Sequence, residues 1–202
     1  MAGTVKYDFY VHTYNDNPES VLDEIKAYHK DSRAILISDG DGKDHACDFF
    51  HKFDERLKDK DARWIRRWFD LARDYGSEVI VKVDPDSILY REFRKPFPDA
   101  LFFGALANCT TPGKEKAYIH GGAQFMTKAF IDAIYDQLCD GDFSGDGFKY
   151  KGGLVCADMI LAHLARKNGI PLVDYEEVAG HGYFRDRKFA ISHGRRAVIK
   201  RA

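Results

Sequence analysis

Short apolar runs alternate with amphipathic segments along most of this chain, and this alternation restricts the fold more than any other feature. The apolar runs with the composition of buried strands lie at 7–11, 34–37, 78–83, 101–106, 118–126 and 170–173. The amphipathic segments, whose apolar residues recur every three or four positions, lie at 17–28, 49–57, 64–75, 127–138 and 156–167. Strands that alternate with helices predict an α/β fold, a mixed and mostly parallel sheet with helices on both faces.

Residues that start and stop helices support these boundaries. Asn17 and Pro18 are typical of a helix start, and Thr127 is suited to cap the helix that follows it. Gly76 and Gly169 stand just after two other amphipathic segments, where glycine ends helices. The aromatic segment 49–57 has apolar residues at helical spacing, so the sequence predicts a helix there.

Composition limits the partners and the number of domains. The 202 residues are 45% hydrophobic, enough for one substantial core, and no linker separates two units. We therefore expect a single domain over 1–202, with a nucleotide-binding part at about 5–90 and an acceptor or catalytic part at about 99–196. Lysine and arginine number 31 against 32 acidic residues, a formal charge of −1, which argues against nucleic acid as a partner.

The sequence shows no signal peptide, membrane span or paired-cysteine motif. The first eight residues lack the apolar run of a signal peptide, and the longest apolar stretch, 100–107, is too short to span a membrane. The expected location is cytoplasmic. The four cysteines have no Cys-x-x-Cys pairing, which predicts buried free thiols rather than disulfides or a zinc site.

Two carboxylates follow the strand at 78–83, separated by one proline. Asp84 and Asp86 can converge on one hard cation, because Pro85 limits how far the pair can separate. Such an ion would hold and neutralise phosphate oxygens. A solvent-exposed Asp-Pro-Asp turn without a metal is the alternative interpretation.

This stretch resembles the D-x-D motif of the GT-A nucleotide-sugar glycosyltransferases. The sequence VIVKVDPDSIL at 79–89 is similar to the strand and KTDDD stretch of the Fringe-like and galactosyltransferase branch, with Pro85 as the middle residue. The resemblance extends from about Tyr7 to Val173 as several short motifs in the right order. It implies a GT-A, Rossmann-like fold and a nucleotide-sugar donor, with UDP as the expected nucleotide.

Further motifs before and after residues 84–86 extend the resemblance. VHTYNDN at 11–17 is similar to the PTYNE segment that lines the nucleotide pocket, and it places Thr13 and Tyr14 there. ILISDGD at 35–41 resembles VVDDG, which implies that Asp39 accepts a hydrogen bond from the base; an ordinary Asp-Gly turn is the alternative. HGGAQFMTK at 120–128 resembles GGAGYVLSR, which implies that Gly121 and Gly122 border the donor sugar.

The same resemblance suggests a base and a third metal ligand. VCADMI at 155–160 looks like EDVYVG, with Ala157 in place of an acid, so Asp158 falls on the family's catalytic carboxylate. The family often supplies a histidine near the carboxyl terminus as a ligand for Mn²⁺ or Mg²⁺. His181 and His193 are both candidates, and the basic neighbours of His193 favour it.

The leading expectation is a metal-dependent glycosyltransferase that moves a sugar from a nucleotide diphosphate donor to a carbohydrate or other hydroxyl acceptor. Asp158 is the expected base if the reaction inverts the anomeric carbon, and it must act otherwise if the reaction retains it. Metal-dependent phosphoryl or nucleotidyl transfer is a second hypothesis, because two aspartates after a strand also serve that chemistry. A non-catalytic nucleotide-sugar binding module is the third.

Overall fold

The chain is described by a computed structural model over residues 7–14, 16–40, 44–45, 47, 49–57, 61–108, 117–138, 156–179 and 188–192. Its helices are α1 (Glu19–Tyr28), α2 (Ala62–Tyr75), α3 (Lys128–Ile134) and α4 (Ala157–Lys167), with a short 3-10 helix η1 (Asp136–Leu138). Its longer strands are β1 (Tyr7–Thr13), β2 (Arg33–Asp39), β3 (Phe49–Phe53), β4 (Val79–Val83), β6 (Phe102–Asn108), β7 (Ala117–Thr127) and β8 (Leu172–Asp174). Three two-residue strands complete the set: β5 (Ile88–Leu89), β9 (Val178–Ala179) and β10 (Ile191–Ser192).

The main sheet has seven strands in the order β3-β2-β1-β4-β7-β6-β8. Strands β1 to β4 pair in parallel, and so do β6 and β8. Strand β7 runs antiparallel to both of its neighbours, β4 and β6. The predicted α/β class with a mixed, mostly parallel sheet is confirmed.

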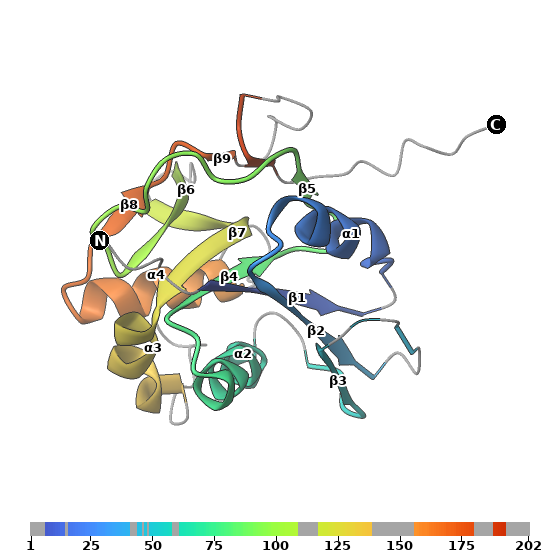
Figure 1. Ribbon diagram of the computed structural model, residues 1–202. Helices are drawn as coiled ribbons and strands as arrows, with labels where there is room; N and C mark the ends of the chain where they lie inside the picture. Colours follow the sequence, from blue (N-terminus) through green and yellow to red (C-terminus); the bar gives the residue numbers. More distant parts are fainter. Residues whose placement is uncertain are drawn as a thin grey trace.

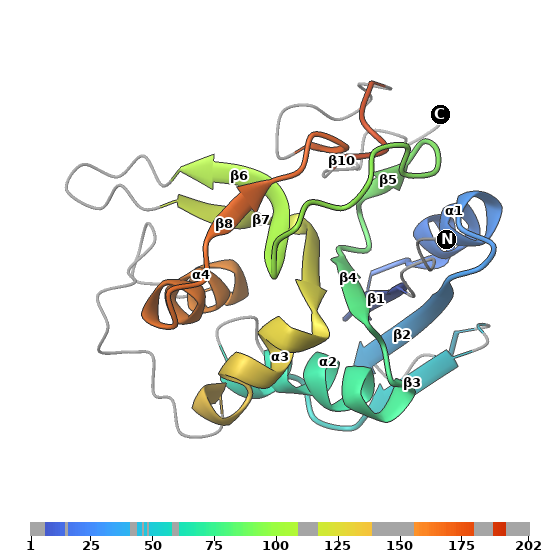
Figure 2. The same ribbon diagram turned by 60° about the vertical axis from the view of Figure 1, so that its left-hand side comes forward.

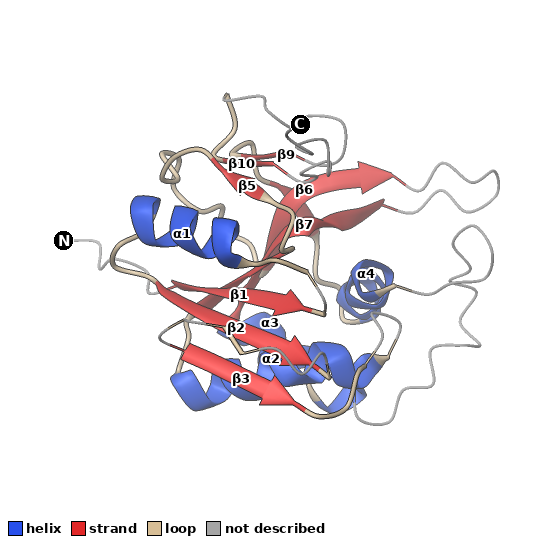
Figure 3. Cartoon of the chain, turned by 90° about the vertical axis from the view of Figure 1, so that its right-hand side faces the viewer, coloured by secondary structure: helices blue, strands red, loops and turns tan. Residues whose placement is uncertain are grey.

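Helices and a second sheet cover the two faces of the main sheet. Figure 1 shows α2 and α3 on one face and α1 on the other, and Figure 2 places α4 on the same face as α2 and α3. The small sheet β5-β10-β9 lies on the α1 face (Figure 3). Each face has its own hydrophobic core cluster.

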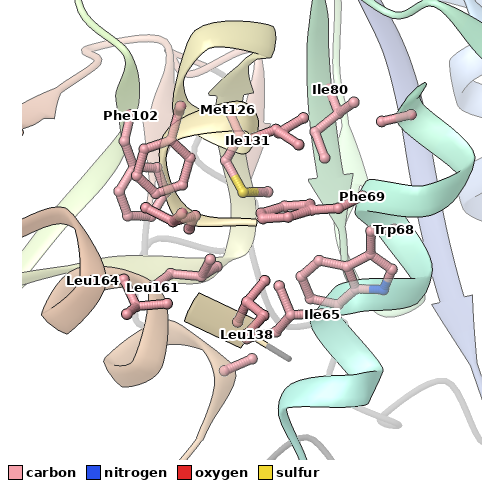
Figure 4. Close-up of a cluster of buried hydrophobic side chains, with 14 of the residues drawn as sticks. Ile65, Trp68, Phe69, Ile80, Phe102, Met126, Ile131, Leu138, Leu161 and Leu164 are labelled. Atoms are coloured by element: carbon pink, nitrogen blue, oxygen red, sulfur yellow. The ribbon is translucent and has the colours of Figure 1, made fainter. Parts of the chain in front are cut away.

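The core on the α2 face is rich in aromatic and branched side chains (Figure 4). Trp68 and Phe69 of α2 are fully buried against Ile80 of β4 and Met126 of β7. Burying each such side chain stabilises the fold by about 2–3 kcal/mol. This packing fixes α2 against the sheet, and with it the residues at the amino end of α2.

The predicted start of α3 and end of α2 are confirmed, whereas α1 begins one residue later than expected, with Pro18 rather than Asn17 at the N-cap position. The side chain of Thr127 accepts a hydrogen bond from the backbone N–H of Phe130 at 3.2 Å, which caps α3. Gly76 ends α2 in the left-handed conformation at φ 61°. The Asn17 side chain accepts from the backbone N–H of Glu19 at 3.0 Å at the start of α1.

The helix predicted at 49–57 is wrong, because residues 49–53 form strand β3. It pairs in parallel with β2, so its side chains alternate between the two faces. Phe49 and Phe53 pack on the α2 face, whereas Phe50 packs on the α1 face. Phenylalanines at these positions fit the period of a helix as well as that of a strand. The segment forms a strand because it pairs with the free edge of β2.

Two smaller expectations also change. The last strand predicted from the sequence is at 170–173, whereas the buried strand β10 lies beyond it and pairs with β5 and β9. Cys47 and Cys156 are free thiols as expected but are only partly buried, and Cys109 and Cys139 lie outside the described residues. Within the described part of the chain, no helix has the length and apolar character needed to cross a membrane.

Candidate active site at the carboxyl ends of β1, β2 and β4

Polar side chains gather where β1, β2 and β4 end. Parallel strands place their carboxyl ends at one edge of a sheet, which is where ligands bind in open α/β folds. His12 and Thr13 close β1, Asp39 closes β2, and Asp84 directly follows β4. Thr13, Asp39 and Asp84, which the sequence analysis singled out, thus lie at the same edge of the sheet, together with His12.

His12 is held in one orientation by two tryptophans of α2. The indole N–H of Trp68 donates to His12 Nδ1 at 2.8 Å, and the Trp64 ring stacks on the imidazole at 4.6 Å. Burial lowers the pKa of His12 below its usual value, although the nearby Asp39 carboxylate opposes this effect. A neutral His12 that accepts through Nδ1 carries its proton on Nε2, which lies 2.9 Å from Asp39 Oδ2.

Asp39 lies at the centre of a buried polar network. Its Oδ1 pairs with the Arg67 guanidinium of α2, and its Oδ2 accepts from the backbone N–H of Leu57 at 3.2 Å. The side chain is only 1% exposed. In this arrangement Asp39 ties β2 to α2, and its predicted contact with a nucleobase would require one of these partners to move.

Lys82 is a buried cation at the next-to-last position of β4, whose other residues are apolar. Its ammonium pairs with Asp84 Oδ1 and donates to the backbone oxygen of Gly121 at 2.8 Å. The rings of Trp64 and Trp68 each lie 5.6 Å from Nζ. Burial lowers the pKa of Lys82, but the charges of Asp84, Asp158 and Asp86 outweigh it and raise that pKa above its ordinary value. Lys82 is therefore the charged centre of the site.

The Asp-Pro-Asp segment forms a turn fixed to β7. The hydroxyl of Ser87 donates to the backbone oxygen of Gly122 at 2.8 Å, and the backbone N–H of Ser87 donates to the Asp84 carbonyl at 3.0 Å. The Asp84 side chain is 25% exposed and Asp86 is exposed. Both carboxylates are thus in reach of solvent at the same edge.

Asp158 reaches this group of residues from the first turn of α4. Its carboxylate packs directly on Gly121, where an added Cβ would lie 2.7 and 2.9 Å from the two oxygens. The amide N–H of Gln124 donates to Asp158 Oδ1 at 3.3 Å. Because Gly121 has no side chain, the Asp158 carboxylate can pack against its Cα, while its carbonyl oxygen accepts from Lys82.

The remaining predicted residues are Thr13 at the end of β1, Tyr14 directly after it, and the two histidines near the carboxyl terminus. Thr13 is buried, and its hydroxyl lies 3.5 Å from the backbone oxygen of Asp16. The Tyr14 ring carries the Arg56 guanidinium at 3.4 Å from its centre. His181 and His193 lie outside the described residues, although β10, which immediately precedes His193, pairs with β5, which begins two residues after Asp86.

The donor types suit Mn²⁺ or Mg²⁺, because both ions prefer carboxylate oxygens. Asp84 and Asp86 provide such oxygens on one turn, at least partly open to solvent. Among the residues that the structure describes, no group of three or more histidine, cysteine, aspartate or glutamate side chains could hold a metal. Diphosphate oxygens, waters or a residue outside the described ranges would have to complete the shell.

Several residues of this site were not singled out in the sequence: His12, Arg67, Trp64, Trp68, Lys82 and Gln124. Two of them carry a visible signal. Lys82 interrupts the apolar run of β4, and Gln124 interrupts the buried residues of β7. A charged or amide side chain within a buried strand must have a partner, and this expectation points to a site.

A separate cavity of about 190 Å³ lies at the opposite edge of the sheet. It is lined by Ala72, Arg73, Gly76, Ser77, Lys128 and Ile131. These residues lie near the start of β4 and the end of β7, away from Asp84. The cavity is not part of the candidate active site.

Neither a protein-family model nor a curated protein matches the sequence. Solved structures match its fold. One is described as a crystal structure of a glycosyltransferase involved in the glycosylation of the major capsid of PBCV-1. It superposes with a TM-score of 0.55 at 9% identity and covers 93% of this chain and 92% of that chain. The chain has a glycosyltransferase fold. At this identity the similarity establishes the fold alone.

Proposed function

We propose that this protein is a metal-dependent glycosyltransferase that moves a sugar from a nucleotide diphosphate donor, a UDP-sugar, to a hydroxyl of a carbohydrate or other acceptor. The fold shared with the capsid glycosyltransferase supports glycosyl transfer as the reaction class. The resemblance to the Fringe-like branch supports the finer assignment of donor and metal.

One observation carries the proposal. The Lys82 ammonium connects two carboxylates: it pairs with Asp84, which follows β4, and it donates to the carbonyl of Gly121, on which Asp158 of α4 packs. Glycosyl transfer needs positive charge near the leaving diphosphate and a carboxylate near the attacking hydroxyl. This arrangement supplies the carboxylates and one fixed cation at the edge where such folds bind ligands.

The proposed roles follow from these positions. Asp84 and Asp86 would hold Mn²⁺ or Mg²⁺, with His193 as a third ligand, and the bound ion would stabilise charge on the diphosphate. Lys82 keeps Asp84 oriented toward this edge. The proposed nucleotide-sugar contacts are Thr13, Tyr14, Asp84, Gly121 and Gly122, and also Asp39 once one of its present partners, Arg67 or Leu57, moves away.

Asp158 is the proposed general base of an inverting reaction. The acceptor oxygen forms a bond to the anomeric carbon while the bond from that carbon to the diphosphate oxygen breaks, and the hydroxyl proton passes to the Asp158 carboxylate. Lying in the first turn of α4, the carboxylate is stabilised as an anion by the positive end of the helix. This weakens it as a base, so positioning must provide most of its effect.

The test is isothermal titration of UDP, GDP and UDP-sugars, with Mn²⁺ and then with a chelator. We expect metal-dependent binding of one nucleotide, lost in Asp86→Ala and kept in Asp132→Ala, which removes an exposed acid of α3. In an acceptor screen, Asp158→Asn should abolish transfer but keep donor affinity.

Other outcomes contradict the proposal in distinct ways. Phosphate release from a phosphomonoester, abolished in Asp84→Ala, would assign the site to phosphoryl transfer. Nucleotide-sugar binding without turnover by any acceptor would make the chain a binding module. Product NMR with the donor's anomeric configuration retained would remove Asp158 as the base of an inverting step.

A further inference from the structure

Gln124 is a fully buried amide directly opposite Lys82 in the sheet. The two residues are paired in register across β4 and β7, and Gln124 is 0% exposed. Its amide nitrogen donates to the backbone oxygen of Ile119 at 2.9 Å and to Asp158 Oδ1 at 3.3 Å. One side chain therefore connects the central sheet to the first turn of α4.

The orientation of the Gln124 amide is set by its neighbours. A reversed amide would point Oε1 at the Ile119 carbonyl and at Asp158 Oδ1, and both of these atoms are acceptors. In the observed orientation Oε1 is buried and has no hydrogen-bond partner among the described residues. A buried oxygen without a partner is unfavourable, so the donor contacts of the nitrogen outweigh that cost.

Gly121 provides the other side of this arrangement. A side chain at 121 would place Cβ within 2.9 Å of both Asp158 oxygens, closer than van der Waals contact allows. The bare backbone therefore leaves a notch in β7, and the carboxylate occupies it. The notch and the Gln124 amide together restrain both the position and the rotation of Asp158.

We propose that Gln124 is a positioning residue for Asp158, because its amide N–H holds the carboxylate in the position and rotation in which it takes up the acceptor proton. The inference rests on the proposed function of Asp158 as the base. The hydrogen bond from the Gln124 N–H to Oδ1 restrains the rotation of the carboxylate relative to the acceptor hydroxyl. The donor also favours the anionic form of the carboxylate before the proton arrives.

The first experiment needs no substrate. The side-chain carboxyl carbon of Asp158, assigned by comparison with Asp158→Asn, is titrated by NMR in wild type and in Gln124→Met. Methionine keeps the length of the side chain but cannot donate. Lys82, the charged neighbour of Asp158 on the sheet, is unchanged in both proteins.

We expect the titration midpoint of Asp158 to rise by about 0.5–1 pH unit in Gln124→Met, because one hydrogen bond to the charged form is lost. An unchanged or lower midpoint in a variant that keeps the wild-type circular dichroism spectrum overturns the proposal. This result does not depend on finding the substrates.

The second experiment uses transfer rates. Gln124→Met should lower kcat about 10- to 100-fold with little change in donor KM, and the acid side of its pH profile should move to higher pH. Gln124→Glu should keep activity near pH 7, because two adjacent carboxyls share one proton and the protonated one can donate. That activity should then fall at higher pH, where the shared proton leaves.

The outcomes separate the two proposals. Wild-type kcat in Gln124→Met, with an active wild-type enzyme, overturns the positioning role and leaves the glycosyltransferase assignment in place. No transfer by the wild type with any donor counts against the proposed function, and the NMR titration then decides the Gln124 contact by itself.

Discussion

Replacing Lys82 by methionine tests whether the buried ammonium holds the site together. The substitution keeps much of the side-chain volume but removes the positive charge between Asp84 and Asp158. The raised pKa of Lys82 in the folded protein means that its charge stabilises the fold below the unfolded pKa, and that this contribution is lost only as pH rises through the folded pKa. The full effect is therefore present at pH 7.

The magnitude follows from the burial of the pair. Removing one partner of a buried ion pair costs about 3–5 kcal/mol, because the other charge remains without compensation. The Asp84 side chain is 25% exposed, so water offsets part of that cost. We expect Lys82→Met to lower the free energy of unfolding by about 2–3 kcal/mol at pH 7.

Urea denaturation followed by circular dichroism measures this change. Lys52→Met is the matched control, because Lys52 pairs with Asp44 at 2.8 Å on the surface and its loss should cost less than about 1 kcal/mol. The double variant Lys82→Met with Asp84→Asn should recover part of the loss. A Lys82→Met protein as stable as wild type would refute the view that Lys82 neutralises these carboxylates.

Two further predictions concern parts of the fold outside the site. Burial lowers the pKa of His29 from 6.5 to about 4, so the stability that the neutral ring contributes is lost as pH falls from 6.5 toward 4. Between pH 7 and 4.5, the free energy of unfolding of the wild type should therefore fall by about 2–3 kcal/mol more than that of His29→Phe in urea titrations. Equal pH dependence of the two proteins would contradict this prediction. Gly104→Ala should cost about 2–4 kcal/mol, since its Cβ would lie 2.6 Å from Ile119 Cγ2 and 2.7 Å from the Ala123 oxygen. Gly169→Ala, also at positive φ but with no atom within 4 Å, should cost only about 1 kcal/mol, and equal losses in thermal denaturation would rule out the steric explanation.

Much of the fold can be predicted from local signals in the sequence. Helix α2 is an example, because its apolar residues lie on one face and Gly76 marks its end. Strand β3 could not be predicted in this way, since Phe49, Phe50 and Phe53 fit a helix as well as a strand. The choice depends on pairing with β2, which is a contact across the chain.

In the candidate site, too, local features could be predicted from the sequence, whereas contacts across the chain could not. Asp84 and Asp39 were placed correctly at strand ends, because position along a strand is local information. Their partners were not predicted: the pair of Arg67 with Asp39 depends on how α2 packs against β2, and the contact of Lys82 with Gly121 depends on the pairing of β4 with β7. Asp158 was predicted from the resemblance, whereas its contact with Gln124, 34 residues away, depends on how α4 packs against β7.

The small sheet has a consequence for the order of folding. Ser192 and Tyr90, whose hydroxyls lie 3.3 Å apart, are separated by 102 residues, and β10 lies between β5 and β9. Closing so long a loop costs conformational entropy before the pairing gives any return. Until residues 188–192 arrive, β5 and β9 have no strand to join them, although Leu89 and Val178 belong to the same core as α1. Completion of the segment that follows Asp86 is therefore expected to be a late and slow event, governed by a part of the chain far away in sequence.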